Sequence, residues 1–281
     1  MPNPIVDPLV EVVDSNANSP LVHIDSSLEG IEVVTLNRPD RKNAFNAELI
    51  AALHEAFETL RGAEGVRVVL IRGAGDTFCA GADLEWMRDA AGYTESENRE
   101  DAFEMAKMLK ALWDLPALTV AMIHGGAFGG GAGLAAACDV ALATRDAKFS
   151  FSEVRLGLIA ATISPYVVAA VGPRTARTLF ATGRVFDAAY AERVGLITEA
   201  ADDFDALGAA AERIIDQTMA CGPQAVAESK RLVSDVVGRH IDRALMEETA
   251  RRIARVRVSP EGQEGVRAFL ERRKPGWAQQ G

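Results

Sequence analysis

The order of hydrophobic and polar residues along the chain predicts alternating strands and helices. Residues 31–36 are rich in β-branched side chains, as is typical of a strand. After Asn46, whose side chain can cap a helix, apolar residues recur at helical spacing as far as Leu60. The apolar run 66–71 predicts a second strand. The chain therefore begins with a β-α-β unit.

The middle of the chain continues this alternation. Met105, Leu109 and Leu112 share one face of a predicted helix. Residues 118–123 have the composition of a buried strand, and a glycine-rich run and a short strand at 140–142 follow. We therefore expect an α/β fold.

The last third of the chain has a different pattern. Beyond Gly183, strand-like runs nearly disappear, and apolar residues recur at helical spacing from Ala206 to Leu270. We expect this part to be all helix. Natural breaks between its helices are Gly195, Gly222-Pro223 and Ser259-Pro260.

Composition narrows the class of protein. The 281 residues are 48% hydrophobic and 25% charged, which is typical of a globular protein with a sizeable core. The net charge of -10 argues against nucleic-acid binding, which needs clustered Lys and Arg. The 3 cysteines are widely spaced and form no metal-binding pair, so we expect free thiols, a cytoplasmic location and no metal.

Two segments bear on membrane association. Residues 1–20 have neither the basic nor the long apolar part of a signal peptide, and we expect a flexible tail there. Residues 117–143 are nearly uncharged and long enough to span a bilayer. His124, Asp139 and the intervening glycines make a buried strand, a glycine loop and a buried helix the better interpretation. We therefore expect no membrane partner.

Two glycine-bearing stretches, 78–84 and 125–131, each end a predicted strand and begin a predicted helix. Helix N-termini present free backbone N–H groups, and two of them aimed at one point would form an oxyanion hole. Two tight turns are an equally compatible interpretation. No Gly-Lys-Ser or Gly-Lys-Thr follows the glycines, which excludes a P-loop, and the match to a dinucleotide-binding fingerprint is weak.

Several motifs occur together in a fixed order, from about Leu21 to Trp277. They are Thr35-Leu36-Asn37-Arg38-Pro39 with Asn43-Ala44, the loop Phe78–Leu84, the loop Gly125–Gly131 with Cys138-Asp139, Phe151-Ser152-Glu153, and Ala268-Phe269-Leu270-Glu271-Arg272-Arg273-Lys274-Pro275. In these motifs the chain resembles the crotonase superfamily, the enoyl-CoA hydratase and isomerase family.

This resemblance implies a fold and an assembly. Residues 21–200 would form a crotonase-like ββα spiral that binds acyl-CoA, and residues 201–281 a helical oligomerisation region that builds a homotrimer, often paired as a hexamer. The substrate would be an acyl-CoA thioester. Coenzyme A is then part of the substrate, and no separate cofactor is implied.

The resemblance also implies roles for individual residues. The thioester carbonyl oxygen would lie between the backbone N–H groups of Ala82 and Gly130. The remaining substrate-binding positions would be Arg41, Ala80, Asp83, Leu84 and Gly126 in the loops, Gly133, and Phe269 and Arg272 near the C-terminus. The last two would help cover the CoA, either that of their own chain or that of a neighbouring subunit.

The carboxylates depart from the family pattern. Hydratases of this family typically use two glutamates, and here the first position falls on Gly133 and the second on Glu153. One glutamate fits double-bond isomerisation. However, residues 152–166 resemble a methylglutaconyl-CoA hydratase-like branch that also has glycine at the first position. The space at Gly133 would then hold a branch or an acid group of the substrate.

Three functions follow from this interpretation. The first is an enoyl-CoA hydratase with Glu153 as acid and base, the second an isomerase or other single-glutamate enzyme, and the third a CoA-binding protein without activity. If Glu153 has only a structural role, it would be a surface carboxylate or a salt-bridged one, with Arg155 as the partner. We expect His124 and Cys79 to be structural, and Asp83 to brace its loop.

Overall fold

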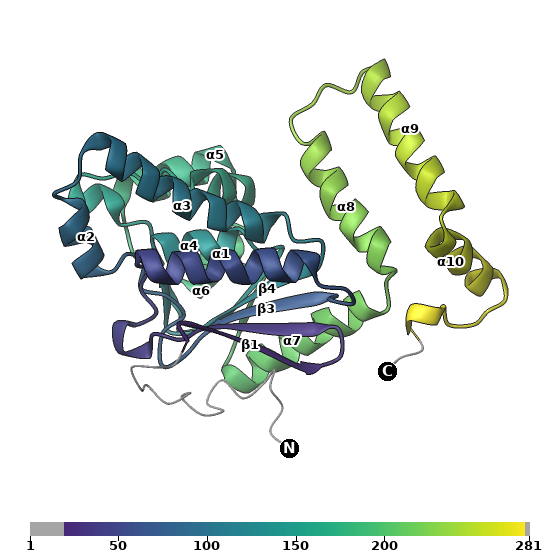
Figure 1. Ribbon diagram of the computed structural model, residues 1–281, viewed down its shortest axis with the longest axis horizontal. Helices are drawn as coiled ribbons and strands as arrows, with labels where there is room; N and C mark the ends of the chain where they lie inside the picture. Colours follow the sequence, from purple (N-terminus) through teal and green to yellow (C-terminus); the bar gives the residue numbers. More distant parts are fainter. Residues whose placement is uncertain (1–19, 279–281) are drawn as a thin grey trace.

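The computed structural model describes residues 20–278, so the predicted tail lies outside the described residues except for Pro20 (Figure 1). Six strands form the main sheet, in the order β1 (Val22–Leu28), β2 (Ile31–Leu36), β3 (Val68–Gly73), β4 (Leu118–Ile123), β6 (Val140–Thr144) and β9 (Glu199–Ala201). β1 pairs with β2 in antiparallel fashion, with a register shift between Asp25 and Leu28. All other pairs in this sheet are parallel.

A second, smaller sheet of three short strands begins within the predicted glycine loop. Its order is β5 (Gly126–Phe128), β7 (Lys148–Ser150) and β8 (Phe186–Asp187). β5 and β7 run parallel, whereas β7 and β8 are antiparallel. This sheet brings the segment after Ser150 back to the glycine loop.

Helices cover both faces of the main sheet. α1 (Ala47–Gly62) and α3 (Glu95–Trp113) lie on one face and α7 (Phe204–Met219) on the other (Figure 1). The side chain of Asn46 accepts a hydrogen bond from the Leu49 amide at 2.9 Å and caps α1, as predicted. Because helices cover both faces of the sheet, neighbouring residues on β2 are buried on opposite faces. The α/β prediction is confirmed.

The smaller helices connect these layers. They are α2 (Leu84–Ala90), α4 (Gly130–Ala136), α5 (Ser164–Thr182), α6 (Ala188–Arg193) and the short 3-10 segments η1 (Pro39–Arg41), η2 (Glu153–Leu156) and η3 (Gly276–Ala278). Residues 117–143 thus form strands, a loop and a short helix. No helix within residues 20–278 is long and apolar enough to cross a membrane.

Three helices follow the body of the protein: α8 (Pro223–Val236), α9 (Arg243–Val258) and α10 (Pro260–Leu270). Two of them start at the predicted breaks, at Pro223 and Pro260. The prediction of an all-helical last third was wrong at two short strands, the two-residue strand β8 and the three-residue strand β9. The residues of β9 are mostly alanine, so their pairing with β6 depends on the neighbouring strand and not on a strong strand propensity.

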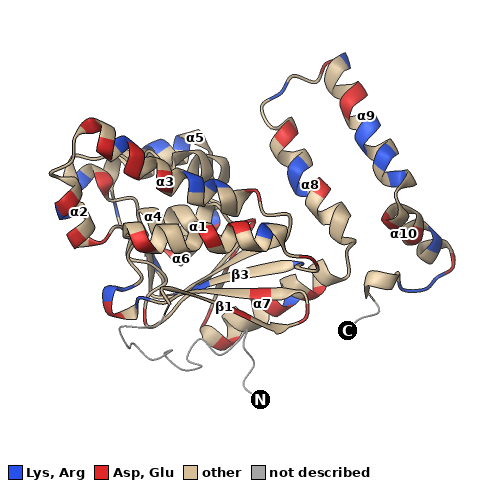
Figure 2. Cartoon of the chain, viewed as in Figure 1, with Lys and Arg blue, Asp and Glu red and all other residues tan. Residues whose placement is uncertain are grey.

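We call α8, α9 and α10 the C-terminal arm. The arm extends away from the body, and Figure 2 shows basic and acidic residues interspersed along it. Within the described chain, only Leu245 and Ala268 of these three helices are buried. The exposed apolar side chains of the arm are Val233, Met246, Ile253, Val258, Val266, Phe269 and Leu270.

Two cations attach the arm to the body. Arg67 donates to the Thr218 and Cys221 carbonyl oxygens at 3.1 and 2.5 Å, at the end of α7. Lys230 on α8 forms an ion pair with Asp139 at 2.6 Å and also donates to the Ala117 carbonyl oxygen. The positive charge of Arg67 also suits the negative end of the α7 dipole. The base of the arm is therefore held by Lys230 directly and by Arg67 through the end of α7.

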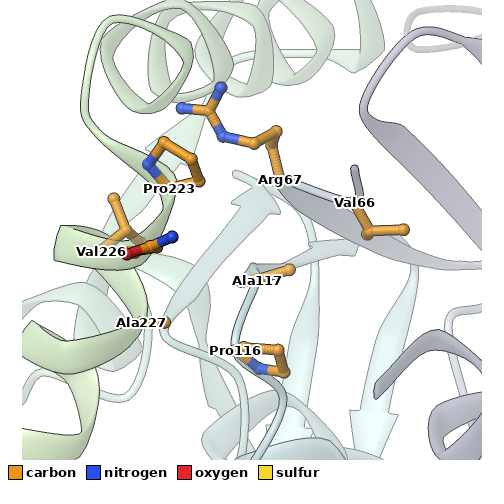
Figure 3. Close-up of a pocket in the computed structure, with 8 residues that line it drawn as sticks. Val66, Arg67, Pro116, Ala117, Pro223, Val226 and Ala227 are labelled. Carbon is orange, nitrogen blue, oxygen red and sulfur yellow. The ribbon is translucent and has the colours of Figure 1, made fainter. Parts of the chain in front are cut away.

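A pocket of about 210 Å³ lies at this attachment (Figure 3). Its lining residues are Val66, Arg67, Pro116, Ala117, Pro223, Gln224, Val226 and Ala227. Residues 66 and 117 precede β3 and β4, so the pocket lies at the amino ends of these strands. The glycine loops follow the carboxyl ends, where parallel sheets commonly bind ligands. The pocket is therefore not the predicted site.

Candidate active site

The two glycine loops lie side by side because they follow the neighbouring parallel strands β3 and β4. The Cys79 amide donates to the Gly126 carbonyl oxygen at 3.1 Å, and the Phe128 amide donates to the Cys79 carbonyl oxygen at 3.0 Å. Gly81 has a φ of +92°, and a Cβ there would lie 2.8 Å from the Phe128 carbonyl oxygen. Glycine at this position therefore permits the close approach of the loops.

Each loop contains a backbone amide, that of Ala82 or that of Gly130, for which the described residues offer no acceptor. Phe45 bridges to the residues on either side of Ala82, donating to the Gly81 carbonyl oxygen at 2.7 Å and accepting from the Asp83 amide at 2.8 Å. The Ala82 N–H points away from this bridge, and Gly130 begins α4, where N–H groups have no helical acceptor. Within residues 20–278, neither amide has a hydrogen-bond acceptor. Both can donate to a ligand.

Asp83 braces the first loop, as predicted. Its carboxylate accepts from the Glu85 amide at 2.8 Å and pairs with Arg38 at 3.0 Å, while Arg38 also donates to the Ala44 carbonyl oxygen. Burial acts to raise the pKa of Asp83, but these hydrogen bonds and the guanidinium hold it below its ordinary value. The carboxylate is thus committed to holding the loop and α2.

Glu153 begins η2, which directly follows the small sheet. The Gly129 amide donates to the Ser150 carbonyl oxygen at 2.8 Å, and this bond holds the Glu153 segment beside the start of α4. Oε1 lies 3.1 Å from the position that a Cβ on Gly129 would occupy. Glu153 is therefore directly beside the second glycine loop.

The carboxyl of Glu153 has its own backbone amide as a hydrogen-bond partner, but one of its two oxygens has no partner in the described part of the chain. Oε2 is buried without a hydrogen bond, and no ion pair forms with Arg155 within residues 20–278. Burial raises the pKa of Glu153 above its ordinary value. A carboxyl of this kind exchanges protons more readily near neutral pH than a solvated one does. The alternative of a carboxylate paired with Arg155 was wrong.

The expectation of free space at Gly133 was also wrong. Gly133 lies one turn beyond Gly129 in α4, and a Cβ there would overlap Cγ2 of Ile163 and lie 2.5 Å from its Cβ. Ile163 is only 2% exposed. The side chain of Ile163 therefore fills the space in which a branch or an acid group was expected.

The predicted CoA contacts of the first loop lie at its rim. Arg41, half exposed, pairs with Glu85 at 3.3 Å, and the Ala80 amide donates to the Lys42 carbonyl oxygen at 2.9 Å. Leu84 is 76% exposed at the start of α2. Ala80 and Leu84 flank Ala82 in its own loop, whereas Arg41 belongs to η1 and reaches α2 through its pair with Glu85.

The other predicted contacts are not all close to this rim. Gly126 is buried, the Phe128 ring occupies the position that a Cβ would take, and its carbonyl oxygen accepts from the Cys79 amide. Phe269, which is 82% exposed, and Arg272 belong to the end of α10. Figure 1 places α10 on the opposite side of the molecule from α2, so one chain alone does not bring these two residues to the loops.

His124 and Cys79 are structural, as expected. Burial lowers the pKa of His124, and its Nε2 lies 2.9 Å from the Gly75 carbonyl oxygen. Burial raises the pKa of the Cys79 thiol to about 12, and Sγ donates to the Asn43 carbonyl oxygen. A neutral imidazole and a protonated thiol fill space beside the loops.

Known proteins with similar sequences identify the family of this chain. The family model described as enoyl-CoA hydratase/isomerase matches residues 26–280. A putative enoyl-CoA hydratase from Thermus thermophilus is 33% identical over 245 residues, which cover 87% of this chain and 96% of that protein. The chain therefore belongs to the enoyl-CoA hydratase/isomerase family.

Solved structures of similar proteins agree with this family assignment. A putative enoyl-CoA hydratase/isomerase (crotonase) from Legionella pneumophila is 41% identical with a TM-score of 0.85, covering 92% of this chain and 99% of that one. An enoyl-CoA hydratase from Shewanella pealeana is 39% identical with a TM-score of 0.88, covering 92% of this chain and 96% of that one. The fold of this chain is the crotonase fold.

Proposed function

We propose that this enzyme adds water across the 2,3 double bond of an enoyl-CoA thioester, with Glu153 as acid and base. The observation that carries this proposal is the partly buried carboxyl of Glu153, which lies beside Gly129, the residue before Gly130, and whose Oε2 has no hydrogen-bond partner within residues 20–278. The thioester carbonyl oxygen would accept hydrogen bonds from Ala82 and Gly130. Arg41, Ala80 and Leu84 would contact the CoA at the rim of the site.

The chemistry follows from the thioester. When water adds to carbon 3, negative charge collects on the carbonyl oxygen, and fixed N–H donors stabilise that enolate without reorganisation. Glu153 would accept a proton from the attacking water and return one to carbon 2. The raised pKa of Glu153 supports both transfers, because it makes the protonated carboxyl easier to reach than it is for a solvated glutamate.

Isomerisation is a second candidate, and one observation favours it. Ile163 occupies the space next to Gly133, which leaves Glu153 as the carboxyl group beside α4. A single carboxyl can move a proton from carbon 4 to carbon 2, and this reaction needs no water. The filled space also removes the support for a branch or an acid group of the substrate at Gly133.

The mass of the product separates these functions. Incubation with a panel of straight and branched enoyl-CoAs is expected to yield products heavier by one water. Products of unchanged mass but shifted double bond would establish the isomerase instead. Binding of CoA without turnover of any member would contradict both and support the non-catalytic protein.

We also propose that the C-terminal arm mediates assembly into a homotrimer or hexamer. Its exposed apolar side chains, with Phe269 and Leu270 at the end of α10, find almost no cover within the chain. Burial of such surface against other copies would be favourable by roughly 25 cal/mol per Å². Phe269 and Arg272 would then reach the CoA of a neighbouring subunit.

Light scattering at micromolar concentration should therefore give the mass of three or six chains. Replacing both Val266 and Leu270 on α10 by aspartate should shift the protein toward smaller species, because charge on this face opposes its burial. Replacing the exposed, polar Gln263 of the same helix by aspartate is the control. A monomeric native protein would contradict the proposal.

A further inference from the structure

Phe45 lies between the two glycine loops and contacts both of them. Its amide donates to the Gly81 carbonyl oxygen at 2.7 Å, and its carbonyl oxygen accepts from the Asp83 amide at 2.8 Å. Its ring lies against Gly130, where a Cβ would be 3.0 Å from Cδ2 and 3.2 Å from Cε2 of the ring. The backbone of Phe45 therefore contacts one loop, and its side chain contacts the other.

The backbone contact sets the direction of the Ala82 amide. Phe45 and Ala82 pair in a parallel bridge, whose two hydrogen bonds go to the residues on either side of Ala82. In such a bridge the N–H group of the middle residue points away from its partner. A movement of Phe45 would therefore turn the Ala82 amide as well.

The ring contact sets the position of the Gly130 amide. Cε of Met105 lies 3.0 Å from the same Cβ position on Gly130, so the start of α4 is in contact with two side chains. Phe45 is 1% exposed and Met105 is 6% exposed. Close packing of this kind leaves a buried ring little freedom to move. The Phe45 ring thus limits how near the start of α4 can come to the first loop.

Asn43 fixes the segment that contains Phe45. Asn43 is fully buried, and its Nδ2 donates to the Ala74 and Thr77 carbonyl oxygens, both at 2.8 Å. Its Oδ1 accepts from the Arg38 amide at 2.9 Å. These bonds hold the backbone two residues before Phe45. The ring and the bridge therefore start from a fixed point.

We propose that Phe45 is a positioning residue for the reaction, because it sets the spacing between the Ala82 and Gly130 amides that would bind the thioester carbonyl oxygen. This inference rests on the proposed function. An oxyanion hole stabilises the enolate without reorganisation only when both donors already lie at hydrogen-bond distance from the oxygen. A misplacement of about 1 Å can cost about 10² in rate. Phe45 acts through these two amides and takes no part in proton transfer.

The test compares Phe45→Leu, which removes the ring edge but keeps an apolar side chain, with Phe57→Leu. Phe57 is fully buried on α1 in the same core, so both variants should lower Tm. At a temperature at which both are folded, Phe45→Leu should lower kcat by about tenfold to 10²-fold with little change in KM, because the alignment matters mainly in the transition state. Phe57→Leu should keep the native kcat. Equal kcat values in the two variants would overturn the proposal.

A second measurement needs no turnover. The probe is acetyl-CoA with an isotope label in its thioester carbonyl, which has no 2,3 double bond to hydrate or to move. Hydrogen bonds from two amides lower the stretching frequency of a carbonyl, so the native protein should shift the infrared band of the bound probe below that of free acetyl-CoA. Phe45→Leu should move the band back toward the free value, and Phe57→Leu should not. A native band position in Phe45→Leu would overturn the proposal.

Failure of the proposed function gives a different result. If the native protein converts no enoyl-CoA but still shifts the acetyl-CoA band, the proposed reaction is wrong, and the band of Phe45→Leu still decides the role of Phe45. If the native protein binds acetyl-CoA without shifting its band, the two amides do not bind the carbonyl oxygen, and both proposals fail. Should Phe45→Leu not fold, Phe45→Met takes its place with the same expected shift, because methionine adapts to irregular space in a core.

Discussion

Replacing Glu153 by glutamine is expected to lower kcat by about 10² to 10⁴, the usual contribution of a general acid or base. Glutamine keeps the shape of the side chain beside Gly129 but cannot take up a proton. Substrate affinity should change little, because the proposed CoA contacts lie at the rim of the first loop. Steady-state kinetics on the best substrate of the panel measure this change. The acidic limb of the pH profile should disappear.

The same substitution should also change how the free energy of unfolding depends on pH. Burial raises the pKa of Glu153 in the folded state, so the unfolded state ionises first as pH rises. Above the ordinary pKa of a glutamate, ionisation therefore favours unfolding. Glu153→Gln is expected to be more stable relative to the native protein at pH 8 than at pH 4, as denaturant unfolding can show.

Glu64→Gln provides the control, since Glu64 is exposed and its removal changes the net charge equally. It should leave both kcat and the pH dependence of stability close to the native values. If Glu153→Gln retained near-native turnover on the true substrate, Glu153 would be structural. The proposed mechanism would then be wrong for either reaction.

Replacing Gly130 by valine is expected to reduce kcat by about 10² to 10³ or more, the typical effect of losing one oxyanion donor. A Cβ at this position would lie 3.0 Å from Cε of Met105 and from the ring of Phe45. The first turn of α4 would have to shift, and the Gly130 amide with it. Affinity for CoA should persist, because the lost interaction belongs mainly to the transition state. Kinetics and calorimetric CoA binding separate the two effects.

Gly62→Val is the matched control. Gly62 ends α1 with open space around it, so a valine there has no contact to disturb. Its kcat should remain near the native value. Unchanged kcat in a folded Gly130→Val variant would remove this amide from the proposed oxyanion hole.

Elements with a strong local signal could be predicted from the sequence. Residues 118–123 are apolar except for Thr119 because β4 is buried on both faces, and the strand has these bounds in the structure. Asn46 identifies the start of α1. β1 was not predicted, because its half-exposed His23 and Asp25 interrupt the apolar pattern. The three short strands of the small sheet depend on pairing partners distant in the chain.

The site divides in the same way. Its two loops follow β3 and β4, so their neighbourhood could be inferred from strand order once the sheet was expected to be parallel. The position of Ile163 could not, because only the packing of α5 against α4 brings it to Gly133, 30 residues earlier in the chain. The pairing of Arg38 with Asp83 likewise joins residues 45 positions apart. Local patterns contain no signal for such contacts.

The two edges of the main sheet limit how copies of the chain can meet. An exposed strand edge with unpaired backbone groups invites strand pairing between molecules, which leads to aggregation. β1 interrupts its own edge through the register shift after Asp25, and β9 offers only three residues. Neither edge can readily extend the sheet into another copy. In the proposed assembly, association through the helices of the arm would therefore meet no competition from growth of the sheet.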